Sequence, residues 1–407
     1  MCNYRRASDV YSHIVKVSFQ FYTVNMKKFV LALLGLLGGL SLIAARSLPA
    51  ETASFPVSIP VPVWSHDLIG PGGYLNDVEI DTAGDPHVLY VDASAAELRY
   101  ARLVSGSWLI ADLGPFPVDL PLSDLSVDLA LDPTNDEPVV AYVDTERDNL
   151  YVGRLHGGMW WFDRVADGGR LVTLRLDASG GAHVAYVSGR DVYYYWRTNG
   201  AWHHETIGPP QDYVWNLFLA LDSAGFPHVA GTGSGGSFYA QRLGSETWDM
   251  AVLPVNDLAN IEGLALDREE QPHFLVTESE IMYGRPPFSR VTLSLVERAG
   301  GLWRFTPLWR DYDWYTEPRL VAGGDGDLHI LYYDAQARPH YLVAQPGSFL
   351  VSERPFAEGI GQMSVSFGAA DQPSITHFDG HSLYLTSRST VMHDHAIFGL
   401  TALTPGE

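Results

Sequence analysis

The stretch from Leu219 to Trp248 reads LALDSAGFPHVAGTGSGGSFYAQRLGSETW, and its pattern recurs along most of the chain. An apolar run ends in Asp222, a turn containing Gly225 follows, and Pro227-His228 opens a second apolar run. A third run contains Tyr239, and a Trp opens a fourth. A pattern that returns at a regular spacing indicates an array of repeated structural units.

Seven units appear when the chain is aligned on the Pro position, with steps of 44 to 56 residues between them. The aligned residues are Pro86, Pro138, Ala182, Pro227, Pro272, Leu328 and Pro373. We expect a Tyr at one equivalent third-run position in every unit: Tyr100, Tyr151, Tyr194, Tyr239, Tyr283, Tyr341 and Tyr384. An aromatic residue opens the fourth run of the first six units: Trp108, Trp160, Trp202, Trp248, Trp303 and Phe349.

Each unit therefore consists of four short runs, separated by Gly, Pro, Asp and Asn. This pattern is typical of a four-stranded antiparallel meander. A step near 45 residues is the length of one blade of a β-propeller. The sequence predicts an all-β fold, a single seven-bladed β-propeller of four-stranded antiparallel blades.

The last unit lacks the aromatic residue of the fourth run, and a similar run lies near the other end of the chain. Trp64 to Gly70 (WSHDLIG) resembles Trp202 to Gly208 (WHHETIG) of the third unit. We therefore expect the ring to be closed by an N-terminal strand, which hides sheet edges that an open array exposes. The alternative is that Val391 to Phe398 supplies the fourth strand itself.

The N-terminal region resembles a secretory signal. Met26-Lys-Lys precedes an apolar run of about 17 residues, which is at the short limit for a membrane span. We expect translation to start at Met26 rather than Met1, followed by cleavage and export, so that the protein is secreted, extracellular or periplasmic. An uncleaved anchor is the alternative, and only then is a membrane involved.

The predicted organisation has four parts. Residues 1–53 form an upstream extension with the signal or anchor, 54–63 a linker, 64–388 the propeller and 389–407 a C-terminal tail. The fifth unit is enlarged by Arg285 to Gly300, which we place between its third and fourth strands. The chain is expected to be a monomer.

Composition excludes several classes of function. The formal net charge of -22 argues against binding nucleic acid, whose phosphates require Lys and Arg. Cys2 is the only cysteine, so a disulfide framework and a thiolate metal site are excluded. His393 and His395 in the tail could hold a metal ion, but a solvated tail is the simpler interpretation, and no metal or other cofactor is predicted.

The face with the first-to-second turns carries a repeated histidine, at His87, His183, His228, His273 and His329. Equivalent positions on different blades cannot converge on one ion, so we expect these histidines to bridge turns by hydrogen bonds. The Asp before each turn is expected to form Asx turns. The repeated Tyr and Trp are expected to pack between blades.

The opposite face carries the second-to-third loops and the connectors between blades, and it is the predicted ligand surface. Its acidic strand ends are Asp92, Asp144, Glu278, Asp334 and Asp379. These carboxylates either cap turns or form a ring that holds a cation such as calcium, or sugar hydroxyls. The connectors add Tyr74, Asp77, Tyr213, Trp215, Tyr312, Trp314 and Tyr315. Exposed aromatics beside carboxylates bind sugars, and the alternative is that these connector aromatics are buried.

The unit Asp-x-x-Gly-x-Pro-His-Val-x-Tyr-x-Asp, with later Leu-x-Tyr and Gly-x-Trp, resembles repeats of exported bacterial seven-bladed β-propellers grouped with sialidase-like, or BNR-like, proteins. The resemblance covers about Trp64 to Arg388 and implies the architecture. That group includes sialidases, polysaccharide lyases and sugar-binding lectins. The Ser-x-Asp-x-Gly-x-x-Trp turns of sialidases are absent here, and no catalytic set is apparent.

Two functions remain open at this point. The favoured one is an exported, non-catalytic binding protein that recognises glycans or cell-surface proteins through the connector face. The alternative is a carbohydrate-active enzyme, either a polysaccharide lyase or a glycosidase, with its site on the same face. The first is favoured because every strongly repeated residue has a structural explanation.

Overall fold

The computed structural model describes residues 55–397 except 117–125, 145–146, 148, 209–211, 245–246, 283–287, 300, 313–317, 325, 335, 346–347, 350–354, 356–359 and 369–370. The chain divides into two compact units, Pro60–Met392 and a second unit of Met1–Ile59 with His393–Glu407. Of the second unit, the described residues are 55–59 and 393–397. They belong to strands β1 (Phe55–Pro71) and β28 (Ser382–Ile397).

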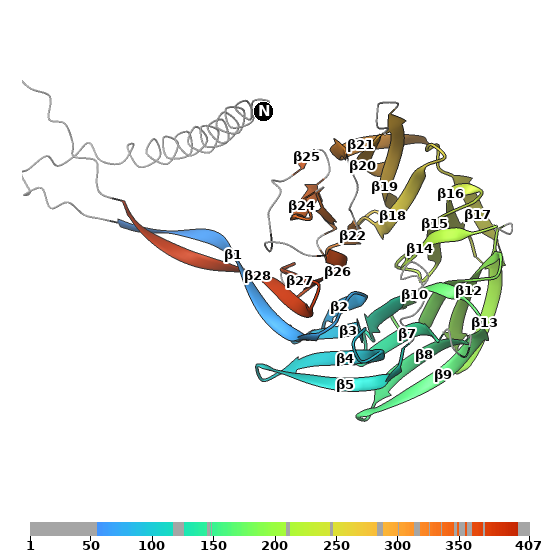
Figure 1. Cartoon of the computed structure of the whole chain (residues 1–407), viewed down its shortest axis with the longest axis horizontal. Coiled ribbons are helices and arrows are strands. Elements are labelled where there is room, and N and C mark those ends of the chain that lie inside the picture. Colours follow the sequence, from blue (N-terminus) through green and yellow to red (C-terminus); the bar gives the residue numbers. More distant parts are fainter. Residues whose placement is uncertain are drawn as a thin grey trace, which may run out of the picture. The chain divides into compact units, whose positions relative to one another are not determined.

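The unit Pro60–Met392 is a ring of seven four-stranded antiparallel sheets, as predicted (Figure 1). Blades 1 to 3 are β2 (Asn76–Ile80), β3 (Pro86–Asp92), β4 (Glu97–Val104) and β5 (Ser107–Pro115); β6 (Val127–Leu131), β7 (Pro138–Asp144), β8 (Asn149–His156) and β9 (Met159–Asp167); and β10 (Arg170–Leu176), β11 (Ala182–Ser188), β12 (Asp191–Thr198) and β13 (Ala201–Ile207).

Blades 4 to 6 follow in the same order along the chain. They are β14 (Val214–Leu221), β15 (Pro227–Gly233), β16 (Gly236–Arg242) and β17 (Trp248–Val252); β18 (Ala259–Leu266), β19 (Pro272–Met282), β20 (Phe288–Ala299) and β21 (Leu302–Tyr312); and β22 (Arg319–Ala322), β23 (Leu328–Tyr333), β24 (Pro339–Gln345) and β25 (Ser348–Phe349). Blade 7 consists of β26 (Ile360–Phe367), β27 (Pro373–Phe378), β28 and, outermost, β1.

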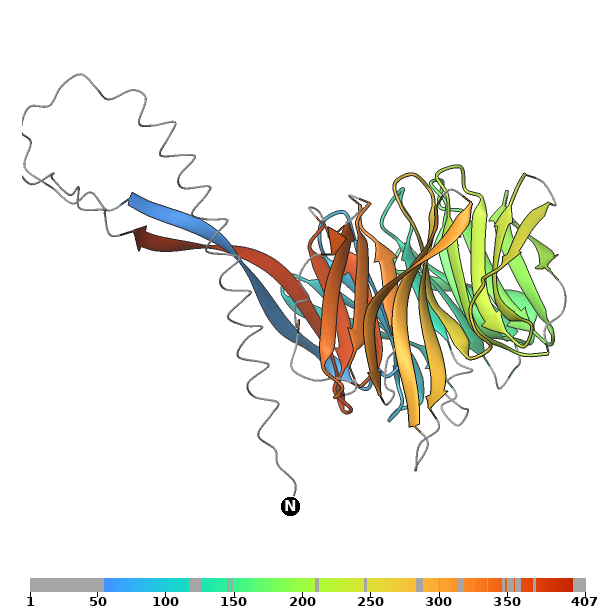
Figure 2. The same cartoon turned by 90° about the horizontal axis from the view of Figure 1, so that it is seen from above.

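The first strand of each blade lies innermost, and these strands form a closed ring in which β26 lies beside β2. Figure 2 shows the ring from the side, with strands running between its two faces. In the outer strand of blade 7, His66 Nδ1 lies 2.8 Å from Thr386 Oγ1 of β28. Since β28 continues as one strand through Val391 to Ile397, these residues are not a separate fourth strand.

The buried hydrophobic residues of the described part of the chain form seven clusters, and each cluster lies between two neighbouring blades. A blade inside the ring is covered on both faces, which explains why β3 and β15 are buried along their whole length. The repeated Trp takes part in this packing. Trp160 contacts Tyr100 of the preceding blade with ring centroids 5.2 Å apart, and Trp248 contacts Tyr194 at 5.6 Å.

The prediction of an equivalent Tyr in every blade is right in four blades and wrong elsewhere. Tyr100, Tyr194, Tyr239 and Tyr341 pair with the residue two places after the repeated His. Tyr151 and Tyr384 are displaced by one residue, which places them on the opposite face of their sheets. In blade 5, Tyr283 lies outside the described residues, and Phe288–Ala299, read as part of an insertion, is the third strand itself.

The terminal boundaries differ from the predicted ones. Strand β1 begins at Phe55, within the stretch read as a linker, and β28 extends to Ile397 in the predicted tail. Residues 1–54, which include the predicted signal, lie outside the described residues. In the part of the chain that is described, no helix is long and apolar enough to cross a membrane.

Candidate functional site

A cavity of about 1130 Å³ occupies the middle of the ring. The innermost strand of every blade contributes to its lining, from β2 round to β26. The connectors also contribute, through Tyr74 and residues 255–258. The cavity therefore reaches the connector face, which the sequence predicts to be the working surface.

The cavity is not symmetric around the ring, because it extends outward over blade 4. From the other blades its described lining comes from innermost strands and the connectors that precede them. From blade 4 it also includes Thr232–Ser237 at the second-to-third turn and Val252 of the outermost strand. We call this extension the blade-4 cleft: Trp215, Asn216, Thr232–Ser237, Val252 and Asn256–Leu258.

The cleft lies beside the hairpin of blade 4, in which three of the six residues are glycine and the other three carry small hydroxyl side chains. Its sequence is Thr-Gly-Ser-Gly-Gly-Ser at Thr232–Ser237, and Gly233 pairs with Gly236. Gly236 has a φ of +101°, which favours glycine. A Cβ there would meet only Val252 Cγ1, at 4.0 Å, so the space beside this hairpin is open. The equivalent turn of blade 1 carries Asp92 and Glu97 instead.

A β-bulge directs Trp215 into the cavity. Val214 pairs with Gly233 and Asn216 pairs with Thr232, which leaves Trp215 as the extra residue of β14. A second bulge, in β18 between Ile261 and Gly263, makes Glu262 the extra residue of that strand. Trp215 and Glu262 both line the cavity. Bulges change the direction of side chains and are frequent beside functional sites.

Trp215 forms an exposed aromatic pair with Tyr213. The Trp215 side chain is 47% exposed and that of Tyr213 is 38% exposed. Their ring centroids lie 5.8 Å apart. The guanidinium of Arg170 lies 3.7 Å from the centre of the Tyr213 ring and donates a hydrogen bond of 2.6 Å to the Val214 carbonyl. Arg170 thus packs against the Tyr213 ring, whereas Trp215 lines the cavity.

Asp77, also predicted as a ligand contact, lines the channel and connects three blades. Its carboxyl group accepts hydrogen bonds from Ser364 Oγ of blade 7 at 2.5 Å and from the Leu129 amide of blade 2 at 2.8 Å. Burial, together with the nearby carboxylate of Asp128, raises the pKa of Asp77 well above its usual range. The Asp77 carboxyl group therefore links blades 7, 1 and 2 within the ring.

Two further charged residues of the channel lie beside Asp77. Burial raises the pKa of Glu79 to about 7, although hydrogen bonding from Ser366 and the charge of Arg175 oppose the shift. The Arg175 guanidinium lies 3.3 Å from the Asp128 carboxylate. Burial lowers the pKa of Arg175, but the surrounding carboxyl groups outweigh it and raise that pKa, so the guanidinium stays charged.

The predicted strand-end carboxylates do not coincide with the cavity, and four of them cap turns. Asp92 accepts hydrogen bonds from the Ser94 and Ala95 amides, Asp144 from that of Arg147, Asp334 from those of Gln336 and Arg338, and Asp379 from those of His381 and Ser382. Asp92 is 1% exposed and Asp334 is 3% exposed. Glu278 is not a strand end, because β19 continues to Met282.

The structure thus brings Tyr74, Asp77 and Trp215 together in one cavity, with Tyr213 beside Trp215. The side chains of Tyr312, Trp314 and Tyr315 lie outside the described residues, as do those of His393 and His395. Within the described residues, no three His, Asp or Glu side chains are grouped so that they could hold a metal ion.

On the opposite face, the repeated histidines bridge structural elements, as predicted. His87 Nδ1 lies 2.6 Å from Tyr100 Oη, and its Nε2 lies 3.3 Å from Asp81. His183 has the same two partners in Tyr194 and Asp177. Burial lowers the pKa of both histidines, so they stay neutral at physiological pH.

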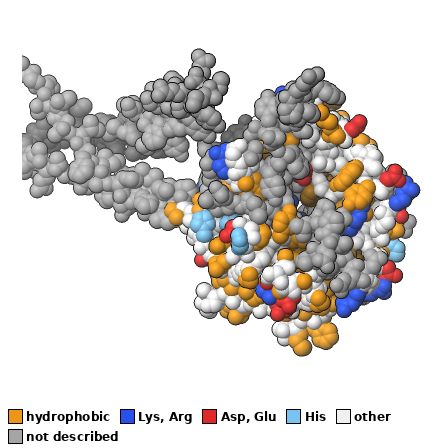
Figure 3. All heavy atoms as spheres, viewed as in Figure 1, with side chains coloured by type: hydrophobic (Ala, Val, Ile, Leu, Met, Phe, Trp, Pro, Cys, Tyr) orange, Lys and Arg blue, Asp and Glu red, His pale blue; other side chains and the backbone are white. Residues whose placement is uncertain are grey.

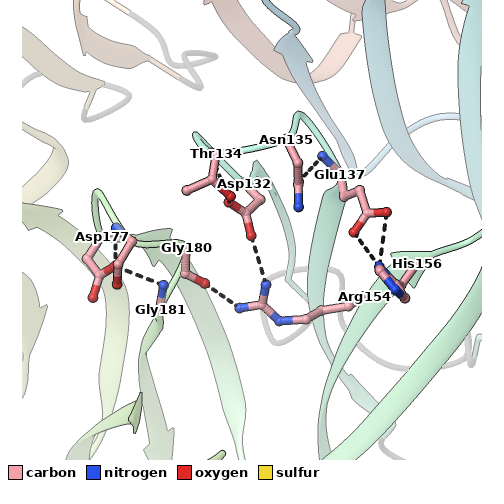
Figure 4. A network of polar contacts seen from close by, with 10 residues as sticks. Asp132, Thr134, Asn135, Glu137, Arg154, His156, Asp177, Gly180 and Gly181 are labelled. Atoms are coloured by element: carbon pink, nitrogen blue, oxygen red, sulfur yellow. Dashed lines mark hydrogen bonds and ion pairs between the residues drawn. The ribbon is translucent and has the colours of Figure 1, made fainter. Parts of the chain in front are cut away.

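The turns of this face are also linked from blade to blade, as Figure 4 shows for blades 2 and 3. Arg154 donates a hydrogen bond of 2.7 Å to the Gly180 carbonyl and another of 3.4 Å to Asp132. Asp177 accepts the Gly181 amide at 2.8 Å, which is the predicted Asx-type turn. This face is therefore occupied by contacts that hold the ring together.

The sequence reasoning missed Glu79, Asn216, the hairpin Thr232–Ser237 and Glu262. A signal for the hairpin was present, because only blade 4 has Gly-Ser-Gly-Gly at its second-to-third turn. The sequence holds no comparable signal for Glu262, because the bulge at this residue is visible only in the pairing of β18 with β19.

No protein-family model matches the chain, and no curated protein matches it. Solved structures do match. A catalytically inactive virginiamycin B lyase from Staphylococcus aureus, with quinupristin, has 11% identity and a TM-score of 0.53, covering 80% of this chain and 99% of that one. The polysaccharide lyase Uly1 has 12% identity and a TM-score of 0.51, covering 78% and 90%.

The SapL1 lectin, in complex with alpha methyl fucoside, has 10% identity and a TM-score of 0.44, covering 70% of this chain and 96% of that one. At this level of identity, the similarity to the two lyases shows the fold alone, and that to the lectin carries no argument. The class that the structure defines is a seven-bladed β-propeller.

Proposed function

We propose that this protein is a non-catalytic binding propeller that holds a glycan in the blade-4 cleft. The observation that supports this proposal is the exposed Trp215, which lies at a bulge and lines a large cavity beside a hairpin of glycines and small hydroxyl residues. An aromatic face that remains open to solvent is suited to stacking on the C–H surface of a sugar ring. The open space beside Gly236 leaves room for the rest of that ring.

The walls of the cleft supply polar groups for hydroxyls. Asn256 and Asp257 are exposed at its edge, and Asn216, Thr232 and Ser234 lie along it. Thr232 Oγ1 already accepts the Ile261 amide at 2.8 Å, and Ser234 Oγ accepts the Asp212 amide at 2.8 Å, so these hydroxyls are fixed in position. Fixed polar groups around an apolar ring give a site its orientation and specificity.

The test is a glycan-array screen with Trp215→Ala and a matched control. Trp161→Ala removes a Trp that is 62% exposed on β9 and does not line the cavity. Other apolar side chains are also exposed, in separate patches on the face seen in Figure 3. We expect Trp215→Ala to abolish array binding with little change in Tm, and Trp161→Ala to retain it. Equal binding by both variants would refute the assignment.

One observation favours a second function, a carbohydrate-active enzyme. The cavity holds Glu79, whose burial raises its pKa to about 7, and a general acid works best with a pKa near the working pH. If the protein is a glycosidase or lyase, incubation with a polysaccharide panel will release new reducing ends, and Glu79→Gln will stop this. Absence of turnover on glycans that bind leaves the binding function.

The cellular setting belongs to the proposal as well. An exported, monomeric protein with glycans or cell-surface proteins as partners agrees with the signal-like residues after Met26 and with the formal net charge of -22. Fractionation of cells that express the full chain would locate it. A mature N-terminus close to the predicted propeller boundary would support cleavage.

A further inference from the structure

We infer that the blade-4 cleft holds a linear glycan chain that lies along the radius of the ring, from the central channel to the outermost strand of blade 4. This inference rests on the proposed glycan-binding function and deepens it. It gives the ligand a length, that of an oligosaccharide rather than a single sugar unit, and a direction across the blade.

The cleft crosses all four strands of blade 4. These strands lie side by side in the order β14, β15, β16 and β17, with β14 innermost (Figure 1). Each strand contributes to the lining, in that order through Trp215 and Asn216, Thr232 and Gly233, Gly236 and Ser237, and Val252. Neighbouring strands are about 4.8 Å apart, so the three steps from β14 to β17 amount to about 14 Å. This distance is greater than the length of one sugar ring.

The strand register places these residues at one end of the sheet. Gly233 of β15 pairs with Gly236 of β16 beside the turn that joins the two strands. Trp215 follows the residue of β14 that pairs with Gly233. On the outer side, Val252 of β17 pairs with Phe238, two residues after Gly236. The lining residues therefore follow the connector-face edge of the blade from strand to strand, and the cleft runs along that edge.

Two connectors border the cleft along its length. Each blade ends at its outermost strand and the next blade begins at the centre, so a connector passes from the rim to the channel. Residues 253–258 join β17 to β18, and Leu253 and residues 255–258 line the cavity. On the other side, the described end of the connector from β13 to β14 is fixed to the hairpin. Ser234 Oγ accepts the Asp212 amide at 2.8 Å, and the Ser234 amide donates to the Tyr213 carbonyl at 2.8 Å.

The middle of the cleft holds no large side chain. Between Thr232 and Ser237 the residues are Gly233, Ser234, Gly235 and Gly236. A Cβ at Gly236 would meet only Val252 Cγ1, at 4.0 Å. Among the described residues, blade 4 is the only blade whose outermost strand lines the cavity. A chain of sugar rings can therefore pass over the hairpin of blade 4 to the rim.

Apolar side chains lie at both ends of the cleft, with polar groups between them. At the channel end, Trp215 and Leu258, the residue before β18, are exposed, and at the rim Val252 is 69% exposed. Ser234 and Asn256 are exposed along the cleft and line it. Sugar rings present C–H faces to apolar groups and hydroxyls to polar ones. A single sugar stacked on Trp215 would leave Val252 uncovered, whereas a chain would cover both.

The test is a glycan array of linear series, from monosaccharide to hexasaccharide, of β-1,4-linked glucose, mannose and N-acetylglucosamine and of α-1,4-linked glucose. It is read with the full protein and with Trp215→Ala, and hits that Trp215→Ala abolishes belong to the cleft. We expect their signal to rise about tenfold from monosaccharide to tetrasaccharide and to stay high for longer chains. A signal that is complete with the monosaccharide, or that falls for longer chains, overturns the chain inference and leaves the glycan-binding function standing. No hits, or hits that Trp215→Ala leaves intact, overturn both.

Calorimetry with Val252→Ala then locates the outer end of the chain. The probes are the disaccharide and the hexasaccharide of the series that gives the strongest signal. We expect Val252→Ala to weaken binding of the hexasaccharide by about fivefold and to leave the disaccharide unchanged, because only the longer chain covers this side chain. The matched control is Val104→Ala, which truncates an exposed valine of β4 that does not line the cavity and should bind both probes as the natural chain does. An equal loss for both probes, or no loss for either, overturns the radial course.

Discussion

We expect the Glu79→Gln variant to gain stability relative to the natural chain as the pH rises. The gain should be larger at alkaline pH than at acidic pH. Burial in the ring raises the pKa of Glu79 from 4.5 to about 7. The folded state therefore holds the proton over a pH range in which the unfolded state has lost it. In that range folding takes up a proton, so the free energy of unfolding falls as the pH rises.

The magnitude follows from the size of the shift. A difference of about 2.5 pKa units corresponds to about 3 kcal/mol, lost between the pKa of the unfolded state and that of the folded state. About 2.5 kcal/mol of this falls between about pH 5 and pH 8. Glutamine resembles the protonated acid and keeps an oxygen for the hydrogen bond that Ser366 donates to Glu79 at 2.9 Å. Glutamine does not ionise, so the free energy of unfolding of the variant does not fall for this reason as the pH rises.

The assay is urea unfolding of both proteins at several pH values and constant ionic strength. Because the chain has a net charge of -22, removing any carboxylate relieves some repulsion. Glu269→Gln, an exposed acid in the turn between β18 and β19, measures that general effect. The reasoning is refuted if the two variants respond to pH in the same way.

Three further outcomes are expected. Trp202→Ala should cost about 3–5 kcal/mol in urea unfolding, because this half-buried ring packs against the core cluster between blades 2 and 3. Tyr239→Phe removes the hydroxyl 2.6 Å from His228 Nδ1 in the buried core and should cost about 1–3 kcal/mol without changing glycan binding. Burial alone raises the pKa of Asp177, but hydrogen bonds lower it to about 2, so its contribution of about 2 kcal/mol is present above about pH 4 and lost on acidification; Asp177→Asn should flatten the acid limb of the stability curve.

The architecture could be predicted because its signals are local and repeated. The second strand begins with Pro in five blades, with Ala in blade 3 and with Leu in blade 6. The aromatic residue of the fourth run is the first or second residue of the fourth strand in blades 1 to 6. Each blade buries both faces against its neighbours, so the same pattern had to recur. The Asx turns and the bridging histidines are short-range too, as Asp81 and His87 are six residues apart.

The Tyr series shows where such reasoning fails. A Tyr occurs near the expected place in six of the units, but Tyr151 and Tyr384 are one residue out of register, and Tyr283 precedes the third strand of blade 5. One residue reverses the face of the sheet on which a side chain lies, and an alignment that tolerates gaps does not detect it.

The sequence by itself determined the number of blades, the strand order within them and the face on which the variable loops gather, because strand periodicity and turn residues act over a few positions. It also pointed to Trp215 as a candidate. Only the tertiary structure decided that Trp215 opens into a cavity, that Asp92 and Asp334 are buried in their own turns, and that Glu79 and Glu262 join the lining. The positions of Trp215 and Glu262 depend on bulges in the strand register, and the lining as a whole depends on the convergence of innermost strands that are far apart in sequence, such as β2 and β26. The charge and shape of the cavity arise only when the ring closes.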